Sequence, residues 1–256
     1  VGDPETRFQE DALRILRGVR FAVRFRLEPE AKTLDAMIRL APTMECLARE
    51  RVFSELCKLL PDMTAEDLLR YAPILTQVIP ELAPAIGFDQ HSPHHAYDVY
   101  THTAHVVGAV SKDIALRLAA LLHDIGKVST FTQDENGRGH FYGHAQESAR
   151  MADEILRRLK APTALREQVV LLIGQHMTIL EPDKKILRRR LGAWGEETVR
   201  HLLALQNADF YNKGVQEEGS LAPVEACLNE VLSEVPCLTV KDLAITGQDM
   251  LSLGIA

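Results

Sequence analysis

The chain has 256 residues, of which 46% are hydrophobic and 5% aromatic, and it carries a formal charge of −7 at pH 7. This apolar content suffices for one large hydrophobic core or two smaller ones, and the negative charge argues against a protein that coats nucleic acid by bulk electrostatics. No apolar run approaches the roughly 18 residues that span a bilayer, no signal-peptide pattern is present, and the four cysteines lack CxxC spacing. We therefore expect a soluble, cytoplasmic protein without membrane partners.

An amphipathic helix is predicted at residues 9–25, where apolar side chains recur on one face and arginines occupy the opposite face. Asp11 and Arg14 are three residues apart and together offer the donors and acceptors that match a nucleobase edge. The same residues also suit an ordinary surface helix, because acidic groups near a helix N-terminus complement its dipole and form i,i+3 pairs. Spacing alone leaves both interpretations open.

Helical periodicity continues along the rest of the chain, and prolines separate many of the segments. The stretch 80–93 contains three prolines and a glycine and is the best candidate for a domain boundary. Residues 130–142, with an Asp-Glu-Asn-Gly-Arg-Gly centre, predict a small hairpin or flap. The sequence therefore predicts an all-α fold, with helices near 30–47, 49–60, 64–79, 96–111, 113–125, 144–159, 163–177, 183–191 and 195–212.

The adjacent pair His123-Asp124 ends an apolar helical run, where an imidazole and a carboxylate pack poorly but suit a divalent cation. Any single histidine is more simply a hydrogen-bonded core or surface residue, and His105 competes with His102 because the two are one helical turn apart. The whole set is harder to explain by separate burials. We therefore predict a metal centre between helices, built from His102, His123, Asp124, His144, His176 and Asp209.

These residues, in this order, resemble the signature of the HD-domain superfamily of metal-dependent phosphohydrolases over residues 94–212. The resemblance implies a helical bundle that holds two divalent ions about 3.5–4 Å apart, which activate a bridging water and clamp a phosphoryl group. Imidazole-rich ligation favours Mn²⁺, Fe²⁺, Co²⁺ or Ni²⁺, with Mg²⁺ bound more weakly. One ion would be bound by His102, His123 and Asp209, the other by His144 and His176, with Asp124 bridging the two.

Other side chains near this set are candidates for contact with a substrate. Lys127 follows His123 by one helical turn and is predicted, together with Asp124, to be catalytic, because its charge suits a phosphate oxygen. A lysine near a helix C-terminus also complements the helix dipole, so its position does not decide between the two roles. Arg138 and His140, in the predicted flap, are equally consistent with substrate contact and with exposure to water.

The N-terminal part is similar to a second family. Residues 3–25, with their Glu-Asp-Ala-Leu-Arg stretch, and residues 51–60 and 87–102 resemble the neck and body of the bacterial tRNA nucleotidyltransferase and poly(A) polymerase family. Many of its bacterial members carry an HD domain after the body. The resemblance implies that Asp11 and Arg14 read the base of incoming ATP or CTP, that Arg17 lies close to the nucleotide, and that the partner is tRNA or another RNA 3′ end. Ala12 replaces the proline of many relatives, at a position that tolerates either residue.

The polymerase chemistry of that family belongs to an N-terminal head domain, and no segment of this sequence resembles it. The sequence begins Val-Gly-Asp-Pro without a Met and stops shortly after an Ile-Thr-Gly-Gln-Asp stretch, so we expect a fragment without transferase activity. We predict a helical neck and body at 1–82, an HD domain at 83–215, and the start of a truncated helical tail at 216–256.

Three hypotheses remain. The first is a fragment of a tRNA 3′-end-processing enzyme whose HD domain hydrolyses phosphomonoesters or 2′,3′-cyclic phosphodiesters of nucleotides or RNA ends. The second is a stand-alone HD nucleotide phosphohydrolase, in which the arginines within 10–24 have no obvious purpose. The third is a non-catalytic tRNA-binding scaffold with a structural metal. The basic run 184–190 is consistent with RNA phosphate contacts as well as with a solvated face.

Overall fold

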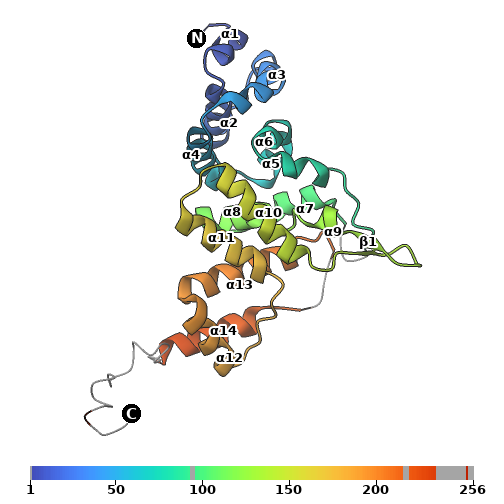
Figure 1. Ribbon diagram of the computed structural model, residues 1–256, viewed down its shortest axis with the longest axis vertical. Helices are drawn as coiled ribbons and strands as arrows, with labels where there is room; N and C mark the ends of the chain where they lie inside the picture. The colour runs from blue at the N-terminus through green and yellow to red at the C-terminus, as the bar shows by residue number, and fades with distance from the viewer. Residues whose placement is uncertain (1, 93–95, 216–218, 235–251, 253–256) are drawn as a thin grey trace. The chain divides into compact units, whose positions relative to one another are not determined.

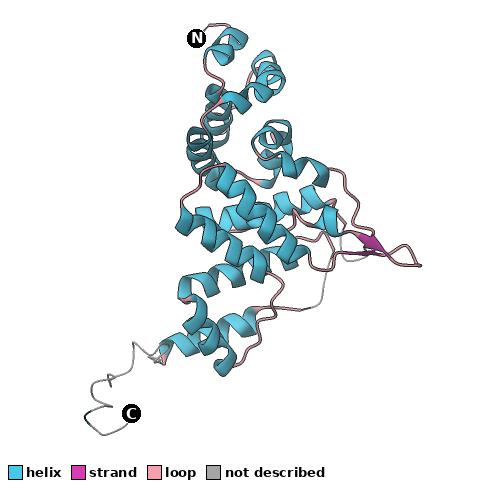
Figure 2. Cartoon of the chain, viewed as in Figure 1, coloured by secondary structure: helices cyan, strands magenta, loops and turns pink. Residues whose placement is uncertain are grey.

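The computed structural model describes residues 2–92, 96–215, 219–234 and 252, and within these ranges the regular secondary structure is helical apart from one two-stranded hairpin (Figures 1 and 2). The predicted all-α fold is confirmed. The described residues form two compact units, one within 1–177 and 204–217 and the other within 178–203 and 218–256. No helix in the described ranges is both long and apolar enough to cross a membrane.

The N-terminal segment forms two helices where the sequence predicted one. Helix α1 (Pro4–Glu10) begins at Asp3, whose carboxylate accepts a 3.0 Å hydrogen bond from Thr6 N, and helix α2 spans Leu13–Phe25. The prediction of a continuous helix from residue 9 was wrong because the backbone becomes extended at Asp11 (φ −153°, ψ 101°). Asp11 Oδ1 accepts a 3.1 Å hydrogen bond from Leu13 N, a local bond that competes with helix continuation.

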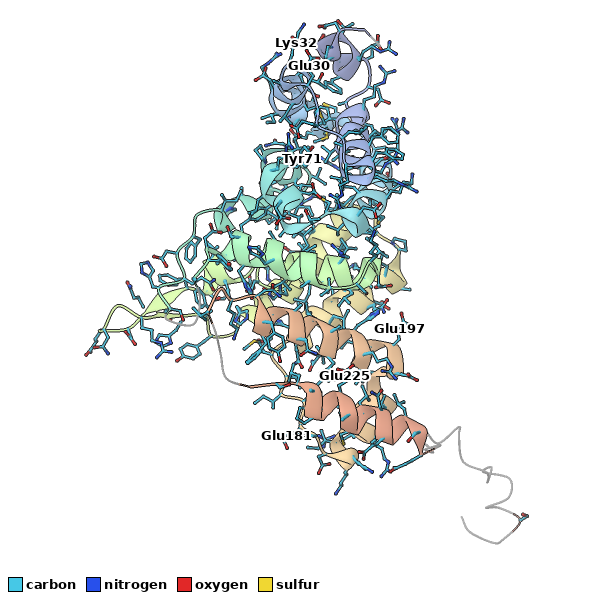
Figure 3. All side chains as sticks on the ribbon, turned by 180° about the vertical axis from the view of Figure 1, so that it is seen from behind. Glu30, Lys32, Tyr71, Glu181, Glu197 and Glu225 are labelled. Carbon is cyan, nitrogen blue, oxygen red and sulfur yellow. The ribbon has the colours of Figure 1, made fainter. Side chains whose placement is uncertain are left out.

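The body is made of short helices that end where prolines begin the next element. Pro42, Pro61 and Pro73 each occupy the first turn of an element, where a missing N–H costs nothing. The predicted helix 64–79 is divided into two helices at Tyr71, which is labelled in Figure 3 and whose side chain is buried. The elements are α3 (Ala31–Leu40), η1 (Ala41–Cys46), α4 (Arg49–Leu59), η2 (Leu60–Asp62), α5 (Ala65–Arg70), α6 (Ala72–Val78) and η3 (Pro80–Ala85).

A bundle of longer helices follows, with α8 (Ile114–Leu122) in contact with α7 (Val99–Ala109) and α11 (Thr163–Gln175), and α11 in contact with α10 (His144–Arg158). Helix α8 is buried along almost its whole length, which explains its nearly continuous apolar sequence. The predicted hairpin is confirmed: β1 (Thr132–Gln133) pairs antiparallel with β2 (Gly139–His140) just after the short helix α9 (Lys127–Thr130), and extends away from the helices (Figure 1).

The body and this bundle are joined by buried polar contacts. Tyr100 Oη donates a 2.9 Å hydrogen bond to Leu68 O. The guanidinium of Arg117, only 5% exposed, donates to Met63 O at 2.8 Å and to Ser111 O at 2.9 Å. These bonds satisfy donors that would otherwise be buried without a partner. The division between 82 and 83, predicted from the sequence, stays a prediction.

The second unit contains α12 (Lys184–Trp194), the first part of α13 (Glu196–Tyr211) and α14 (Ala222–Ser233). Helices α12 and α14 are in contact, and the basic run of α12 is partly neutralised there: Lys184 Nζ lies 2.7 Å from a carboxylate oxygen of Glu234, which also pairs with Arg188. These pairs account for two of the cations that were considered for RNA contact. The tail stretch 245–249 lies outside the described residues.

Candidate metal centre

The six predicted ligands converge from five helical segments of the first unit. His123 is the residue directly after α8, His144 is the first residue of α10, and His176 directly follows α11. Because these three imidazoles stand at helix ends, they reach a common point without breaking the packing of the helix interiors. Of the remaining candidates, His102 lies in α7 and Asp209 in the last part of α13, whereas Asp124 lies in the turn between α8 and α9.

Asp124 is the centre of the cluster. Its carboxylate is 2% exposed, and its two oxygens face different pairs of histidines. Oδ2 lies 3.3 Å from His123 Nε2 and 3.5 Å from His102 Nε2, whereas Oδ1 lies 3.4 Å from His144 Nε2 and 3.9 Å from His176 Nε2. Two groups of donors that could hold a metal ion therefore share one carboxylate.

Asp209 completes the first of these groups. Its Oδ1 lies 3.0 Å from His102 Nε2 and 4.0 Å from His123 Nε2, and its side chain is 21% exposed. Asp209 therefore borders both the cluster and the solvent-accessible space above it. The structure brings together all six residues that the sequence singled out.

Each of the four imidazoles is fixed in one tautomer by a backbone carbonyl. Nδ1 lies 2.7 to 3.0 Å from a carbonyl oxygen in every case, and a carbonyl oxygen only accepts. In the neutral ring Nδ1 therefore carries the proton, and Nε2 presents its lone pair to the cluster, as in histidines that ligate metals. The pairs are His102 with Asn212, His123 with Ala120, His144 with Phe141, and His176 with Ile173.

Two contacts show that a cation fits this donor set. His144 Nε2 lies 3.2 Å from His176 Nε2, and two lone pairs at this distance repel unless positive charge lies between them. Burial lowers the pKa of both imidazoles, that of His176 to about 4, so neither is protonated at neutral pH. Moreover, His123 Nε2 is fully buried without a hydrogen-bond partner among the described residues. Imidazole nitrogen with carboxylate oxygen suits a divalent transition metal.

The carboxylates of the cluster are held in their ionised form. Burial alone would raise the pKa of Asp124, but the charges of His123 and Lys127 outweigh it and hold the pKa well below its usual range. In the metal-free chain the pKa of Asp209 is likewise lowered, because the interaction with His102 and the charge of His123 outweigh burial. Ionised carboxylates in a buried site are the form that ligates a metal.

Lys127 is buried, which decides against the solvated role considered for it. Its Nζ lies 2.7 Å from Asp124 Oδ2 and donates a 2.9 Å hydrogen bond to Gln90 Oε1, and its residue exposure is 5%. Gln90 is itself buried, at 1% exposure, and was missed by sequence reasoning. Nothing in the sequence around Gln90, a proline-rich connection, indicates that its amide binds Lys127, which is 37 residues away.

Gly126, between the His-Asp pair and Lys127, allows the close approach of α10. A Cβ at this position would lie 2.7 Å from Ser148 N and 2.9 Å from His144 O. The Gly126 N–H donates a 2.9 Å hydrogen bond to Ser148 Oγ. This contact positions the first turn of α10, and with it the ligand candidate His144.

The choice between His102 and His105 is resolved by packing. The ring of His105 stacks on Tyr97 at a centroid distance of 4.8 Å, and His105 is absent from the donor groups around Asp124. A cavity of about 270 Å³ lies over the centre, lined by Asp124, Lys127 and Lys213 and by the hairpin residue His140. Arg138, the other flap residue considered, is exposed and is not part of this lining.

The N-terminal candidates are arranged differently from the prediction. Asp11 lies in the turn before α2, and its carboxylate is 3.2 Å from Arg51 of α4. Arg14 instead binds Glu10 at 2.6 Å, and Arg17 lies 3.6 Å from the buried Glu55. Asp11 and Arg17 line two separate hollows, both of which include Arg51. The three residues thus share a neighbourhood but do not form one helical face.

A helical bundle in which an adjacent His-Asp pair meets histidines and an aspartate from other helices defines an HD-domain protein, and residues 94–212 match the family model described as HD domain. Residues 25–86 match the model described as probable RNA and SrmB-binding site of polymerase A. Together with the relatives described next, these matches show that the chain belongs to the tRNA nucleotidyltransferase and poly(A) polymerase family.

Three relatives illustrate the match. The CC-adding tRNA nucleotidyltransferase of Thermus thermophilus is 33% identical over 95% of this chain and 60% of its own length. The A-adding tRNA nucleotidyltransferase of Deinococcus radiodurans is 33% identical over 80% of the chain and 50% of the relative. The multifunctional CCA protein of Aromatoleum aromaticum is 35% identical over 66% and 43%. The chain therefore spans between 43% and 60% of the length of these relatives.

Proposed function

We propose that residues 83–215 form a metal-dependent phosphohydrolase that acts on phosphomonoesters or 2′,3′-cyclic phosphodiesters of nucleotides or RNA ends. The observation that carries this proposal is the position of the Asp124 carboxylate. Its two oxygens face different histidine pairs beneath a cavity of about 270 Å³. A carboxylate shared in this way suits two cations side by side, and paired cations are typical of enzymes that cleave phosphate esters.

In this proposal the cations are Mn²⁺, Fe²⁺, Co²⁺ or Ni²⁺, and Mg²⁺ would be bound more weakly by these ligands. When bound, they supply Lewis acidity to a phosphoryl oxygen and lower the pKa of a nearby water molecule. His102, His123 and Asp209 would hold the first ion, and His144 and His176 would hold the second, with Asp124 contributing to both sites.

The chain's own side chains supply the binding and the orientation. Lys127 and Lys213 line the cavity, so two positive charges attract the phosphate group of a substrate. Because Lys127 Nζ already lies 2.7 Å from Asp124 Oδ2, a phosphate at the centre meets an ammonium group that is held in place. The carbonyl bonds to the four Nδ1 atoms keep the rings from turning. Asp124 and Lys127 are therefore the catalytic residues of this proposal.

The test is metal content by mass spectrometry on the purified chain, with a 2′,3′-cyclic AMP hydrolysis assay on the same sample in added Mn²⁺ or Ni²⁺. We expect close to two ions per chain and turnover. Asp124→Ala should abolish turnover while circular dichroism shows unchanged helicity, and His105→Ala, one helical turn from a ligand, should retain both. Absence of metal under every loading condition would overturn the proposal. Loss of the fold in Asp124→Ala would favour a structural metal.

For the full-length protein we propose a role in tRNA 3′-end processing in the cytoplasm, with tRNA or another RNA 3′ end as partner. The names of the relatives support this, as does the match of residues 25–86 to an RNA-binding model. We further propose neck and body, HD and tail segments at 1–82, 83–215 and 216–256. ATP or CTP would be bound by Asp11, Arg14 and Arg17.

The nucleotide proposal is tested in the full-length protein with Arg14→Ala. The expected result is a changed ratio of CTP to ATP incorporation, because a base-reading donor is lost. Arg24→Ala is the matched control, since Arg24 is exposed on the same helix. An unchanged ratio in Arg14→Ala would contradict a base-reading role.

A further inference from the structure

Two stacked rings stand at the edge of the cavity over the metal centre. Tyr142 is 78% exposed, and its ring lies parallel to that of His140, with a centroid distance of 5.4 Å and an interplanar angle of 8°. Both residues line the cavity. A large aromatic side chain that is this exposed gains little from folding, so its position calls for a partner outside the chain.

The rings are held by an anchored framework. Phe141, between them in sequence, packs on Phe131 at a centroid distance of 5.6 Å, and Phe131 packs on Phe88 at 5.3 Å. At the strand next to them, Gly139 N donates a 2.8 Å hydrogen bond to His91 O, and a Cβ on Gly139 would collide with the carbonyl oxygen of Gln90. The base of the hairpin is therefore fixed to the segment before α7.

The connection to the metal centre is equally short. Gly143 follows Tyr142 with φ of 76°, a conformation that glycine adopts without strain, and the next residue is His144. The His144 ring donates through Nδ1 to Phe141 O at 2.8 Å. Tyr142 thus lies in sequence between an anchored phenylalanine and a ligand candidate, so the backbone on both sides of it is held in place.

The lining of the cavity has two chemically different ends. Lys127 and Lys213 carry positive charge beside the carboxylates Asp124 and Asp209, whereas Tyr142 and His140 present a flat, stacked surface. A ligand that matches both ends has a phosphate group joined to a planar ring. Base-on-aromatic stacking is largely tolerant of base identity, because every base has a π-face.

We infer that Tyr142, supported by His140, is the surface on which the base of the substrate stacks. The inference rests on the proposed phosphohydrolase, whose substrates are nucleotides or RNA ends, and adds the residues that bind the base. Tyr142 acts on binding, so it changes affinity for the base without taking part in the chemistry.

Binding is measured by calorimetry on the Mn²⁺-loaded chain with two ligands that cannot be hydrolysed. One is the phosphonate analogue of AMP, in which a methylene group replaces the ester oxygen, and the other is ethylphosphonate, which has no base. We expect the nucleotide analogue to bind at least roughly ten-fold more tightly, a preference of the size that one stacked base supplies. Tyr142→Ala should remove most of that preference, and Tyr142→Phe should keep it.

The control is Phe25→Ala, which removes another exposed, stacked aromatic ring, at the end of α2, and should leave both affinities unchanged. Equal affinities in the wild-type chain, or a preference that survives Tyr142→Ala, would overturn the inference. A trinucleotide ending in the same phosphonate group distinguishes the two sources of the base: tighter binding than the mononucleotide identifies an RNA end, and equal binding identifies a free nucleotide.

Turnover of 2′,3′-cyclic AMP on the same preparations separates this inference from the proposed function. A Tyr142-dependent preference without turnover would leave the base-binding surface standing and remove the hydrolase. Turnover with no Tyr142-dependent preference in binding would leave the hydrolase standing and remove the base-binding surface.

Discussion

Gln90 Oε1 accepts a 2.9 Å hydrogen bond from Lys127 Nζ, and both side chains are buried. The amide of Gln90 is itself oriented, because its Nε2 donates to Tyr97 O at 3.1 Å. Gln90 therefore helps to hold the ammonium group in place beside Asp124. It belongs to the connection between body and bundle rather than to any helix that carries a ligand.

We predict that Gln90→Met slows hydrolysis of 2′,3′-cyclic AMP roughly ten-fold in kcat and lowers the free energy of unfolding by about 1–3 kcal/mol, because a buried donor loses its acceptor. Steady-state kinetics and urea unfolding measure the two effects. Gln90→Glu, which keeps an acceptor oxygen, serves as the control and should retain more of the rate. A normal kcat in a destabilised Gln90→Met would assign the residue to folding alone.

Mn²⁺ should raise the melting temperature of the chain, because an ion that binds only the folded state stabilises it by about 2.7 kcal/mol at a hundred-fold excess over Kd. Differential scanning calorimetry with and without EDTA measures the shift. His176→Ala should reduce the shift, since it removes one donor, whereas His105→Ala should leave it intact. An identical shift in His176→Ala would contradict the assignment of this residue to a metal.

The metal-free chain should lose stability as the pH falls from about 6.5 to about 4. Burial lowers the pKa of His176 to about 4, so in this window the unfolded chain takes up a proton that the folded chain does not, and unfolding is favoured. The full loss from this residue is about 3 kcal/mol. The pKa of His123 is raised by the nearby carboxylates in spite of burial, which opposes the effect.

Urea unfolding in EDTA at pH 7 and pH 5 measures this dependence. In His176→Asn, which has no imidazole to protonate, the difference between the two pH values should shrink. A pH dependence equal to that of the wild type would show that another group titrates in its place.

Gly126→Ala should weaken Mn²⁺ binding with little change in helical content. The added Cβ would lie 2.7 Å from Ser148 N and 2.9 Å from His144 O, so the first turn of α10 must move and His144 with it. Equilibrium dialysis with Mn²⁺ measures the affinity, and Gly174→Ala is the control, because the nearest atom to its added Cβ is 3.7 Å away. Unchanged Mn²⁺ affinity in Gly126→Ala would mean that the site tolerates the shift.

The sequence was most informative where chemistry is local to a few residues. The His-Asp pair and the four other ligand candidates were identifiable because such side chains are poor choices for a helix interior, and the hairpin because its turn residues are specific. Their role as ligands stays a prediction, although the structure places them together.

Other features depend on packing that a sequence pattern does not encode. The break at Asp11 follows from a competition between a side-chain bond to Leu13 N and the helix, which periodicity does not resolve. His102 and His105 differ by about 60° in direction around α7, and the role of Gln90 depends on a contact across 37 residues.

The bonds from Arg117 to Met63 O and from Tyr100 to Leu68 O have a consequence for modularity. If the chain were cut between body and bundle, a buried guanidinium and a buried hydroxyl would lose acceptors that belong to the other piece. The bundle is therefore not an independent module. A protein that contains the bundle must also contain the helices around Met63 and Leu68, or provide other acceptors for Arg117 and Tyr100.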